Sequence, residues 1–332
     1  MDQRLLERAC QLYLTSPDQL TPLSGGHFNA VYQYACGEKL AILRIGVEDY
    51  PSEQTLSMLD FMRYLSQENA PVARPLLSAN GMFLESLEFK GKRYNITACE
   101  KAAGTLAEDI PPSRWTDDLF CSIGKAVGKL HRISAEFRPS VSGFIRPHWF
   151  ESSEIHDAIG LLSTSSDPAR EKLAILVQGL RSLPTDPGDY GLIHDDLHFA
   201  NFLVRADDSV TVFDFDDCEY GWFAMDVAMA LFDVLVLYNA GNETESQFFA
   251  HRFMHAYLAG YLQERDLSTY WLSQIPNFLK LKELCIYASL IGHPDVNLPD
   301  TWVGRFMRNR AERIARDIPY VDIDFSTLRD LY

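Results

Sequence analysis

The residues best suited to chemistry lie in one short stretch of the chain, residues 191–221. Asp196 and Asn201 are separated there by four residues, and Asp214 follows thirteen positions after Asn201. Carboxylate and amide oxygens suit Mg²⁺, a hard cation that takes one or two carboxylates and fills its other positions with water and substrate phosphates. Phosphoryl transfer also needs a carboxylate to orient the attacking hydroxyl and accept its proton, and an Asp a few residues before the Asn suits this task. The pattern therefore indicates phosphoryl-transfer chemistry.

The segments around these residues predict the strands that would bring them together. The apolar runs 202–204 and 210–213 are typical of short strands, and the turn 206–209 joins them. The two acidic residues of that turn are assigned to the tip of the hairpin, because such residues are common in surface turns. The pair of strands would hold the first two polar residues at one end and return Asp214 beside them.

This combination of motifs resembles a known family of enzymes. His194, Asp196 and Asn201, followed by Asp214 at a strand end, resemble the catalytic loop and metal-binding Asp of the aminoglycoside phosphotransferase and choline kinase family. That family includes homoserine kinase type II-like proteins and is distantly related to protein kinases. The resemblance implies ATP and Mg²⁺ as cofactors, with Asp196 as catalytic base, His194 as a supporting catalytic-loop residue, and Asn201 and Asp214 as metal ligands.

The resemblance also implies a fold. We expect an α+β, two-lobed, protein-kinase-like fold with an N-terminal antiparallel sheet plus a helix and a mainly helical C-terminal lobe. Residues 1–100 would form the nucleotide-binding lobe, and residues 101–332 would form the lobe with the catalytic loop and acceptor site. A protein kinase would more often have Arg in place of Asp195 and Gly in place of Asp216.

Composition limits the classes of function. The chain has 332 residues, of which 47% are hydrophobic and 23% charged, as in ordinary globular proteins. Its net charge of −16 argues against nucleic-acid binding, which needs Lys and Arg at phosphates, and is compatible with a cationic substrate. We expect no signal peptide, no membrane span and a cytoplasmic location. The cysteines form no C-x-x-C pair and are expected to be free thiols: Cys10, Cys36, Cys99, Cys121, Cys218 and Cys285.

The N-terminal segment predicts a phosphate-binding sheet. Residues 2–14 have helical periodicity, and residues 20–45 predict three antiparallel strands around a glycine turn. Gly25 and Gly26 would let the backbone approach phosphate oxygens, and Arg44 on the third strand would reach the phosphates with its planar donor group. Relatives have Lys or Arg at this position, so Arg44 fits the resemblance.

The next helix departs from the family pattern. Residues 51–67 have an apolar helical face. In relatives a Glu on this helix pairs with the phosphate-binding Lys or Arg, but here Met58 occupies that position. Glu53 is the alternative partner, and the question stays open.

The remaining chain predicts a hinge and a helical lobe. Strands at 82–89 and 93–99 lead to a hinge at 100–104, where backbone groups of Glu100 and Ala102 would bind adenine by resemblance. Asp226 matches an Asp that braces the catalytic loop in relatives. The predicted helices are 115–131, 150–162, 168–183, 223–238, 246–263, 270–290 and 301–315.

These observations predict a kinase that phosphorylates a hydroxyl of a small molecule. Asp216, Asp217 and Glu219 follow the metal ligand and would face the acceptor, which favours an amine-bearing substrate such as an amino alcohol, amino acid or aminosugar. A Ser/Thr protein kinase of the bacterial stress-response type is one alternative, although few residues separate Asp214 from the next helix. A nucleotide-binding scaffold without turnover is another, because the helix Glu is missing.

Overall fold

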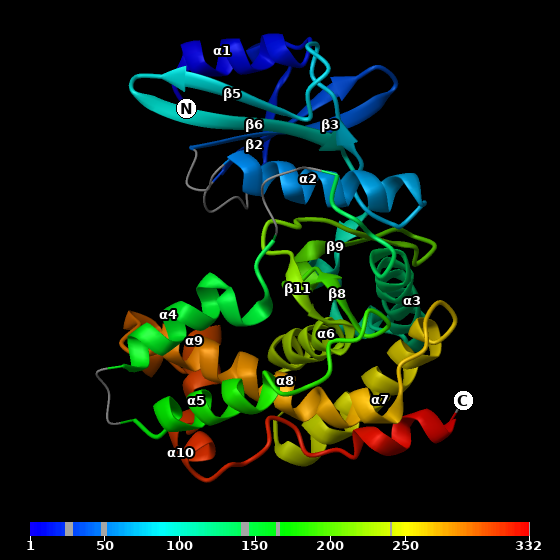
Figure 1. The fold of residues 1–332 in the computed structure, drawn as a ribbon, viewed down its shortest axis with the longest axis vertical. Coiled ribbons are helices and arrows are strands. Elements are labelled where there is room, and N and C mark those ends of the chain that lie inside the picture. The colour runs from blue at the N-terminus through cyan, green and yellow to red at the C-terminus, as the bar shows by residue number, and fades with distance from the viewer. Residues whose placement is uncertain (24–28, 48–51, 141–145, 164–166, 240, 332) are drawn as a thin grey trace.

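The computed structural model describes the chain apart from residues 24–28, 48–51, 141–145, 164–166, 240 and 332 (Figure 1). Two lobes are stacked along the long axis of the molecule, an N-terminal sheet with two helices and a larger, mainly helical lobe, as the sequence predicted. The predicted phosphate-binding glycines, Gly25 and Gly26, lie outside the described residues.

The N-terminal lobe is built on an antiparallel sheet. Its strands follow the order β1-β2-β3-β6-β4. β5 also pairs with β6, along residues 92–97, whereas β4 pairs with residues 98 and 99 of the same strand. The predicted strands of this lobe are confirmed. The bounds of its elements are α1 Gln3–Leu12, β1 Thr21–Leu23, β2 Asn29–Cys36, β3 Lys39–Val47, α2 Ser52–Gln67, β4 Pro75–Leu76, β5 Leu84–Phe89 and β6 Lys92–Glu100.

Two helices cover this sheet and belong to different hydrophobic cores. α1 lies across the outer side of the sheet (Figure 1), and Leu5 and Ala9 of the helix pack against it together with Tyr13, the C-cap residue. Their spacing of four residues places them on one face of the helix. α2 lies between the sheet and the helical lobe and packs into the larger core, where Phe61 is completely buried. Its ring contacts those of Phe137 and Phe215 in the second lobe at 5.1 and 5.8 Å between centroids.

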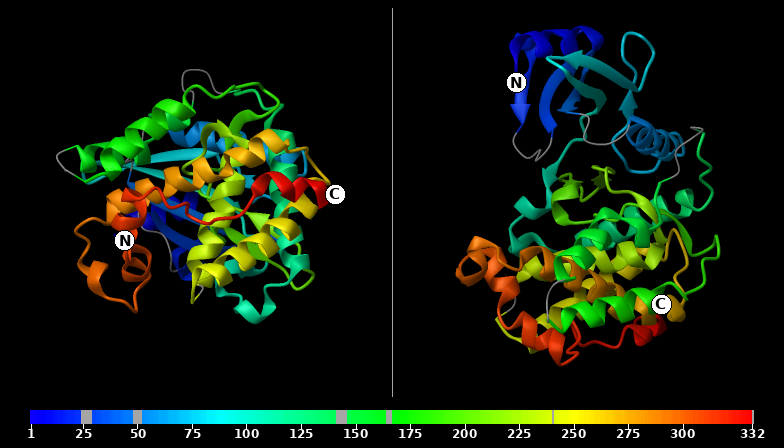
Figure 2. Two further views of the ribbon diagram at one scale, coloured as in Figure 1. Left: turned by 90° about the horizontal axis from the view of Figure 1, so that it is seen from below. Right: turned by 60° about the vertical axis from the view of Figure 1, so that its left-hand side comes forward.

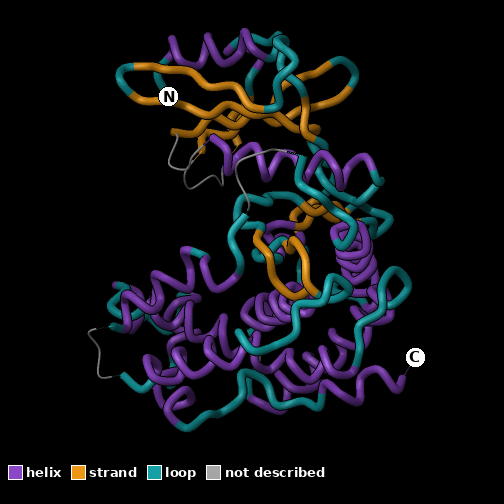
Figure 3. Tube along the Cα trace, viewed as in Figure 1, coloured by secondary structure: helices purple, strands orange, loops and turns teal. Residues whose placement is uncertain are grey.

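The C-terminal lobe surrounds two small antiparallel ribbons with helices (Figure 3). β9 and β10 pair as predicted, β7 extends this ribbon, and β8 pairs with β11. The elements of this lobe are β7 Thr105–Leu106, α3 Asp117–Ser134, α4 Ser153–Leu162, α5 Ala169–Leu180, β8 Tyr190–Ile193, β9 Phe202–Val204, β10 Val210–Val212, β11 Glu219–Trp222, α6 Phe223–Tyr238, α7 Glu243–Tyr261, α8 Thr269–Leu290, α9 Trp302–Met307 and α10 Arg310–Ala315. None of the described helices is long and apolar enough to span a bilayer.

Several features differ from the sequence-based expectation, among them the short strands β4 and β7, which were not predicted. The helix predicted over 301–315 is broken into α9 and α10, because Asn309 adopts a left-handed conformation with φ of 55°. β11 was not predicted as a strand, because its four residues (219–222) follow an acidic run with no alternating pattern. Its pairing with β8 across the sequence fixes it instead.

Helices α3 and α7 pack in close contact within the C-terminal lobe. The right-hand view in Figure 2 shows this lobe below the N-terminal sheet. A Cβ added to Gly260 would lie 1.8 Å from the carbonyl oxygen of Cys121, and one added to Gly124 would lie 1.9 Å from that of Tyr257. The two backbones can approach this closely only because neither residue has a side chain.

We therefore expect Gly260→Ala to lower the free energy of unfolding by about 2 kcal/mol or more through overpacking. Gly160→Ala is the matched control, because this residue lies in α4 and a Cβ added to it would have no neighbouring atom within 4 Å. Alanine there is expected to be neutral or to stabilise by about 0.5 kcal/mol. Urea unfolding of both variants measures the difference, and equal stabilities would contradict the close-packing account.

Candidate active site

The catalytic loop begins where β8 ends and is held by one buried carboxylate. The backbone N–H groups of His194 and Asp195 donate to the two oxygens of Asp226, each at 2.8 Å. The Nε2 of His131 lies 3.0 Å from the same carboxylate, and the imidazole is fixed on its other side by the hydroxyl of Tyr261 at 2.9 Å. Asp226 and His131 are completely buried. The predicted bracing position of Asp226 is therefore occupied as expected.

His194 connects the loop to the end of β10. Its Nδ1 accepts from the backbone N–H of Asp196 at 3.3 Å, which leaves Nε2 to donate to the carbonyl oxygen of Phe213 at 3.0 Å. The side chain is completely buried. Both ring nitrogens are thus engaged in holding the segments that carry Asp196 and Asp214.

Asp196 and Asn201 lie against each other, as the sequence pattern predicted. The amide nitrogen of Asn201 donates to the backbone oxygen of Asp196 at 2.9 Å and to its carboxylate at 3.1 Å. His198 Nε2 lies 3.1 Å from the same carboxylate. Burial by itself raises the pKa of Asp196, but the hydrogen bond and charge of His198 outweigh it and hold the pKa well below its usual range. Asp196 is therefore ionised at neutral pH, with about a third of its side chain open to solvent.

Asp214 joins this pair from the other strand and meets Arg44 from the N-terminal lobe. The backbone N–H of Phe213 donates to the carbonyl oxygen of Asn201 at 3.1 Å, which sets the two segments side by side. Asp214 has a left-handed backbone with φ of 65°. Arg44, on β3, lies 3.6 Å from its carboxylate. The four residues predicted from different parts of the chain are thus brought together.

The acidic partner of Arg44 comes from the C-terminal lobe. Arg44 donates to both carboxylate oxygens of Asp216, one of them at 3.1 Å. On α2, Met58 is buried in the core and Glu53 is exposed. In this structure Asp216 therefore pairs with Arg44 in place of a Glu on the helix.

Asp217 and Glu219, the other two predicted substrate residues, differ in their exposure to solvent. Asp217 is exposed and lies close enough to Asp196 for the two charges to repel. Glu219 begins β11 opposite Ile193 and is 2% exposed. Arg146 donates to the carbonyl oxygen of Asp216 at 2.6 Å and also to that of Cys218, which fixes the path between them.

The two predicted hinge residues, Glu100 and Ala102, differ in their hydrogen bonds. The backbone N–H of Glu100 donates to the carbonyl oxygen of Arg74 at 2.8 Å, and the carboxylate of Glu100 pairs with the ammonium of Lys39 at 3.1 Å. In the described part of the chain the N–H of Ala102 donates to no other residue. This free donor is compatible with the predicted contact to adenine, which stays a prediction.

The structure also brings residues to the site that the sequence did not single out. Asp195, Glu154 on α4 and Lys282 on α8 meet Glu219 around one small cavity. Lys282 and Glu154 form an ion pair at 2.8 Å. Asp195 was visible beside the motif, but α4 and α8 are far from it in sequence and nothing in their patterns pointed to the site.

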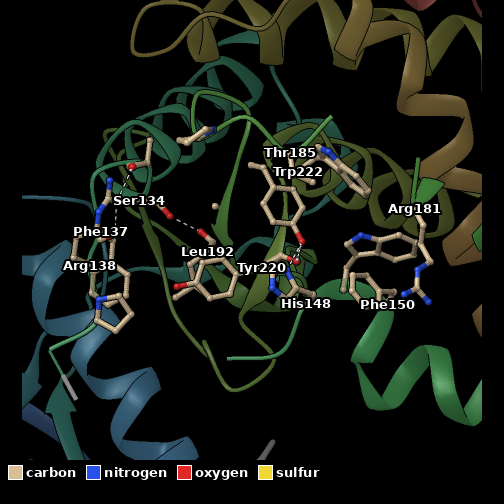
Figure 4. A pocket seen from close by; sticks show the side chains of 16 residues that line it. Ser134, Phe137, Arg138, His148, Phe150, Arg181, Thr185, Leu192, Tyr220 and Trp222 are labelled. Carbon is tan, nitrogen blue, oxygen red and sulfur yellow. Dashed lines mark hydrogen bonds between the residues drawn. The ribbon is translucent and has the colours of Figure 1, made fainter. Parts of the chain in front are cut away.

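A larger pocket of about 600 Å³ lies elsewhere in the C-terminal lobe (Figure 4). It is lined by aromatic side chains, among them His148, Tyr190 and Tyr220, and by Arg138 and Arg181 at opposite ends of the view. His148 and the backbone oxygen of Tyr220 are each 2.8 Å from the hydroxyl of Tyr190. None of the predicted site residues lines this pocket.

The donor set fits a magnesium ion. Because the amide nitrogen of Asn201 faces Asp196, its Oδ1 is left without a hydrogen bond from any described residue, although Asn201 is 4% exposed. Asp214 supplies a carboxylate beside it. No group of three His, Cys, Asp or Glu side chains converges into a metal site within the described residues. One carboxylate with one amide oxygen is instead the sparse set that Mg²⁺ uses when phosphates provide other ligands.

Comparison with known proteins agrees with this chemistry. Residues 19–267 match the model of the phosphotransferase enzyme family. The chain belongs to this family. It is 29% identical to the amicoumacin kinase of Bacillus subtilis over 98% of this chain and 96% of that protein.

Solved structures give the same result. An amicoumacin kinase in complex with AMP-PNP, Ca²⁺ and Ami superposes with a TM-score of 0.84 at 29% identity, over 98% of this chain and 97% of that one. A microcompartment-associated aminopropanol kinase, at 23% identity, shares the fold with a TM-score of 0.71 over 95% and 98% of the two chains. The family member described here is accordingly a kinase.

Asp226→Asn tests the brace of the catalytic loop. An amide can accept through only one of its two polar atoms, so one of the two N–H donors of the loop would lose its partner. We expect the free energy of unfolding to fall by about 3 kcal/mol, together with a loss of turnover. Asp157→Asn, at an exposed position on α4, is the control. Unchanged stability of Asp226→Asn in urea unfolding would contradict the role of the brace.

Asp233 on α6 generates a pH dependence of stability. It accepts from the N–H of Phe199 at 2.7 Å, and burial raises its pKa to about 6, with contributions from the charges of Asp196 and Glu108. His198 lowers the pKa but does not offset the burial. The folded state therefore holds this proton more tightly than the unfolded state, so the free energy of unfolding falls as pH rises from about 4 to about 6.

Asp233→Asn removes this titration while its amide oxygen still accepts from Phe199. The variant is expected to unfold with a free energy about 2 kcal/mol higher than the parent at pH 7.5, and the difference should shrink below pH 4. Chemical unfolding at several pH values measures it. A difference that does not change with pH would rule out the raised pKa.

Proposed function

We propose that this protein transfers the γ-phosphate of ATP to a hydroxyl group of a small, amine-bearing molecule. The observation that carries the proposal is the meeting of Asp196 and Asn201 on the catalytic loop with Asp214, while Arg44 reaches Asp214 from the opposite lobe. A base, two oxygen ligands and a phosphate-neutralising cation are the parts that phosphoryl transfer requires.

In the proposed reaction the acceptor oxygen attacks the γ-phosphorus while the bond from that phosphorus to the β-γ bridging oxygen breaks. Asp196 orients the hydroxyl and takes its proton, and ADP leaves. Its low pKa keeps the carboxylate ionised and able to accept a hydrogen bond, so orientation contributes more than basicity. Asn201 and Asp214 would hold Mg²⁺, which neutralises phosphate charge when bound. Arg44 would neutralise the remaining charge.

The charge near Asp196, where the acceptor would bind, supports a cationic substrate. Asp217 is exposed beside Asp196, and the chain as a whole has a net charge of −16. Opposite charge in a cleft raises the local concentration of a cationic ligand. The likeness to an amicoumacin kinase over nearly the whole chain supports a small acceptor. The choice among amino alcohol, amino acid and aminosugar is left to the experiment.

The two alternatives are less well supported. A protein kinase would hold its peptide on a long activation segment, but here β11 begins five residues after Asp214, and Arg146 fixes the intervening backbone. A scaffold without turnover would have no need for Asp196 in contact with Asn201. The likeness to small-molecule kinases also favours turnover.

A panel of acceptors tests the proposal. ATP consumption is measured with amino alcohols, amino acids and aminosugars, with the matching alcohols that lack the amine, and with a generic protein substrate. We expect turnover with at least one amine-bearing hydroxyl compound. Turnover with the protein alone would favour the protein kinase, and nucleotide binding without any turnover would favour the scaffold.

Asp196→Asn tests the assignment of the base. The amide cannot accept the proton, so kcat is expected to fall by roughly a thousandfold, while folding and nucleotide binding persist. Asp207→Asn, at the exposed tip of the β9–β10 hairpin, should keep the parent activity. Near-normal kcat in Asp196→Asn would refute the assignment.

A further inference from the structure

Two buried carboxylates beside the catalytic base have no partner among the described residues. Asp195 is 8% exposed and Glu219 is 2% exposed. Within that part of the chain neither carboxylate accepts a hydrogen bond or lies within ion-pair distance of a cation. Buried carboxylates are normally paired, because leaving one without a partner costs several kcal/mol. Both side chains line the same cavity, so a single group could satisfy them together.

Neither carboxylate is needed to build the backbone. Asp195 has φ of 66°, a left-handed conformation that glycine adopts with less strain. Glu219 pairs with Ile193 through its backbone, and its side chain is not part of that pairing. At both positions a buried uncharged side chain would therefore destabilise the folded state less than a carboxylate does.

The positive charge near the cavity is already in use. Lys282 is the one basic side chain among the described residues that line it, and its ammonium is 2.8 Å from Glu154. Three carboxylates thus face one ammonium. Burial and the proximity of the other carboxylates raise the pKa values of Asp195 and Glu219 well above their usual range. The described lining of the cavity therefore has more acids than bases to neutralise them.

We propose that this cavity binds the primary ammonium group of the acceptor, with Asp195 and Glu219 as its hydrogen-bond acceptors. The inference rests on the proposed function, because it assigns a place for the amine of the same substrate. An ammonium has three N–H donors, which suit two carboxylates and one further oxygen such as the Ser152 hydroxyl at the cavity wall. Such charge-assisted hydrogen bonds are stronger than neutral ones.

The size of the cavity selects the type of amine. The space in it that can hold the centre of a water-sized group is about 10 Å³, which is close to the minimum for a single water molecule. A primary ammonium has this size and a trimethylammonium group does not. Phe278 is the one aromatic ring among the described lining residues, whereas quaternary ammonium groups are bound by cages of several rings. The site therefore favours primary amines over choline-like compounds.

The position of the cavity also limits the distance between amine and hydroxyl. Asp195 and the base Asp196 are adjacent in the chain, and the charge of Lys282 reaches both. An acceptor with its amine a few bonds from its hydroxyl meets this requirement.

Ethanolamine and choline test the inference directly, because they differ only in three N-methyl groups. Their binding to the full chain is measured calorimetrically in the presence of Mg²⁺ and AMP-PNP. We expect ethanolamine to bind at least roughly tenfold more tightly than choline, and Asp195→Asn and Glu219→Gln each to weaken ethanolamine by roughly tenfold. The nucleotide affinity should stay the same.

Two further variants separate recognition from folding. Asp195→Gly removes the carboxylate and suits the left-handed backbone, so it should fold normally and still lose ethanolamine. Asp157→Asn removes an equal charge from the exposed face of α4 and should keep ethanolamine affinity within about twofold. Equal binding of choline, retention of ethanolamine affinity in both cavity variants, or absence of ethanolamine binding to the parent chain would overturn the inference.

The same reagents distinguish this inference from the proposed function. If ethanolamine binds as expected but no acceptor of the panel consumes ATP, the proposed function fails and the ammonium site stands. If acceptors turn over equally well with and without an amine, and the cavity variants change neither kcat nor KM, the kinase stands and the ammonium site fails.

Discussion

The structure of this site depends on one buried carboxylate, that of Asp226. It receives the first two N–H groups of the catalytic loop, and the loop has no regular secondary structure to satisfy them otherwise. His131 and, through it, Tyr261 tie the same carboxylate to α3 and α7. A loop can keep functional side chains in place only where a rigid scaffold fixes its backbone. Here that scaffold is a hydrogen-bond network buried in the helical core.

Around the catalytic loop there are more acidic side chains than basic ones, and this sets the distribution of charge. Arg44 faces Asp214 and Asp216, and Lys282 faces Glu154. Both cations therefore act on the acids nearest to them. The arrangement leaves a surplus of negative charge around Asp217 and a fixed positive charge at Arg44, which is the asymmetry required by the proposed transfer of phosphate to a cationic acceptor.

The two lobes are held together by contacts of α2 as well as by the hinge. Phe61 packs on Phe137 and Phe215, and the carboxylate of Asp60 accepts from the backbone N–H of Ser140 at 2.6 Å. Phe215 also lies 4.5 Å from the ring of His194. The helix beneath the N-terminal sheet is thereby in contact with the residue that follows Asp214, so the positions of the lobes and of Asp214 are linked through packing.

The amino-acid sequence by itself indicated the family, most of the helices and strands, and the residues that we propose for phosphoryl transfer. Apolar runs and turns are local properties, and the β9–β10 hairpin places Asn201 and Asp214 together through a short turn, so their proximity could be inferred. The break of the last predicted helix at Asn309 was not inferred, because a single left-handed residue leaves helical periodicity intact. Only the tertiary structure decided that Asp216 is the partner of Arg44 and that Glu154, Glu219 and Lys282 meet at Asp195. Those contacts join β3, α4, α8 and β11, and the pairing of charges across such distances depends on how the helices pack, which no local pattern in the chain specifies.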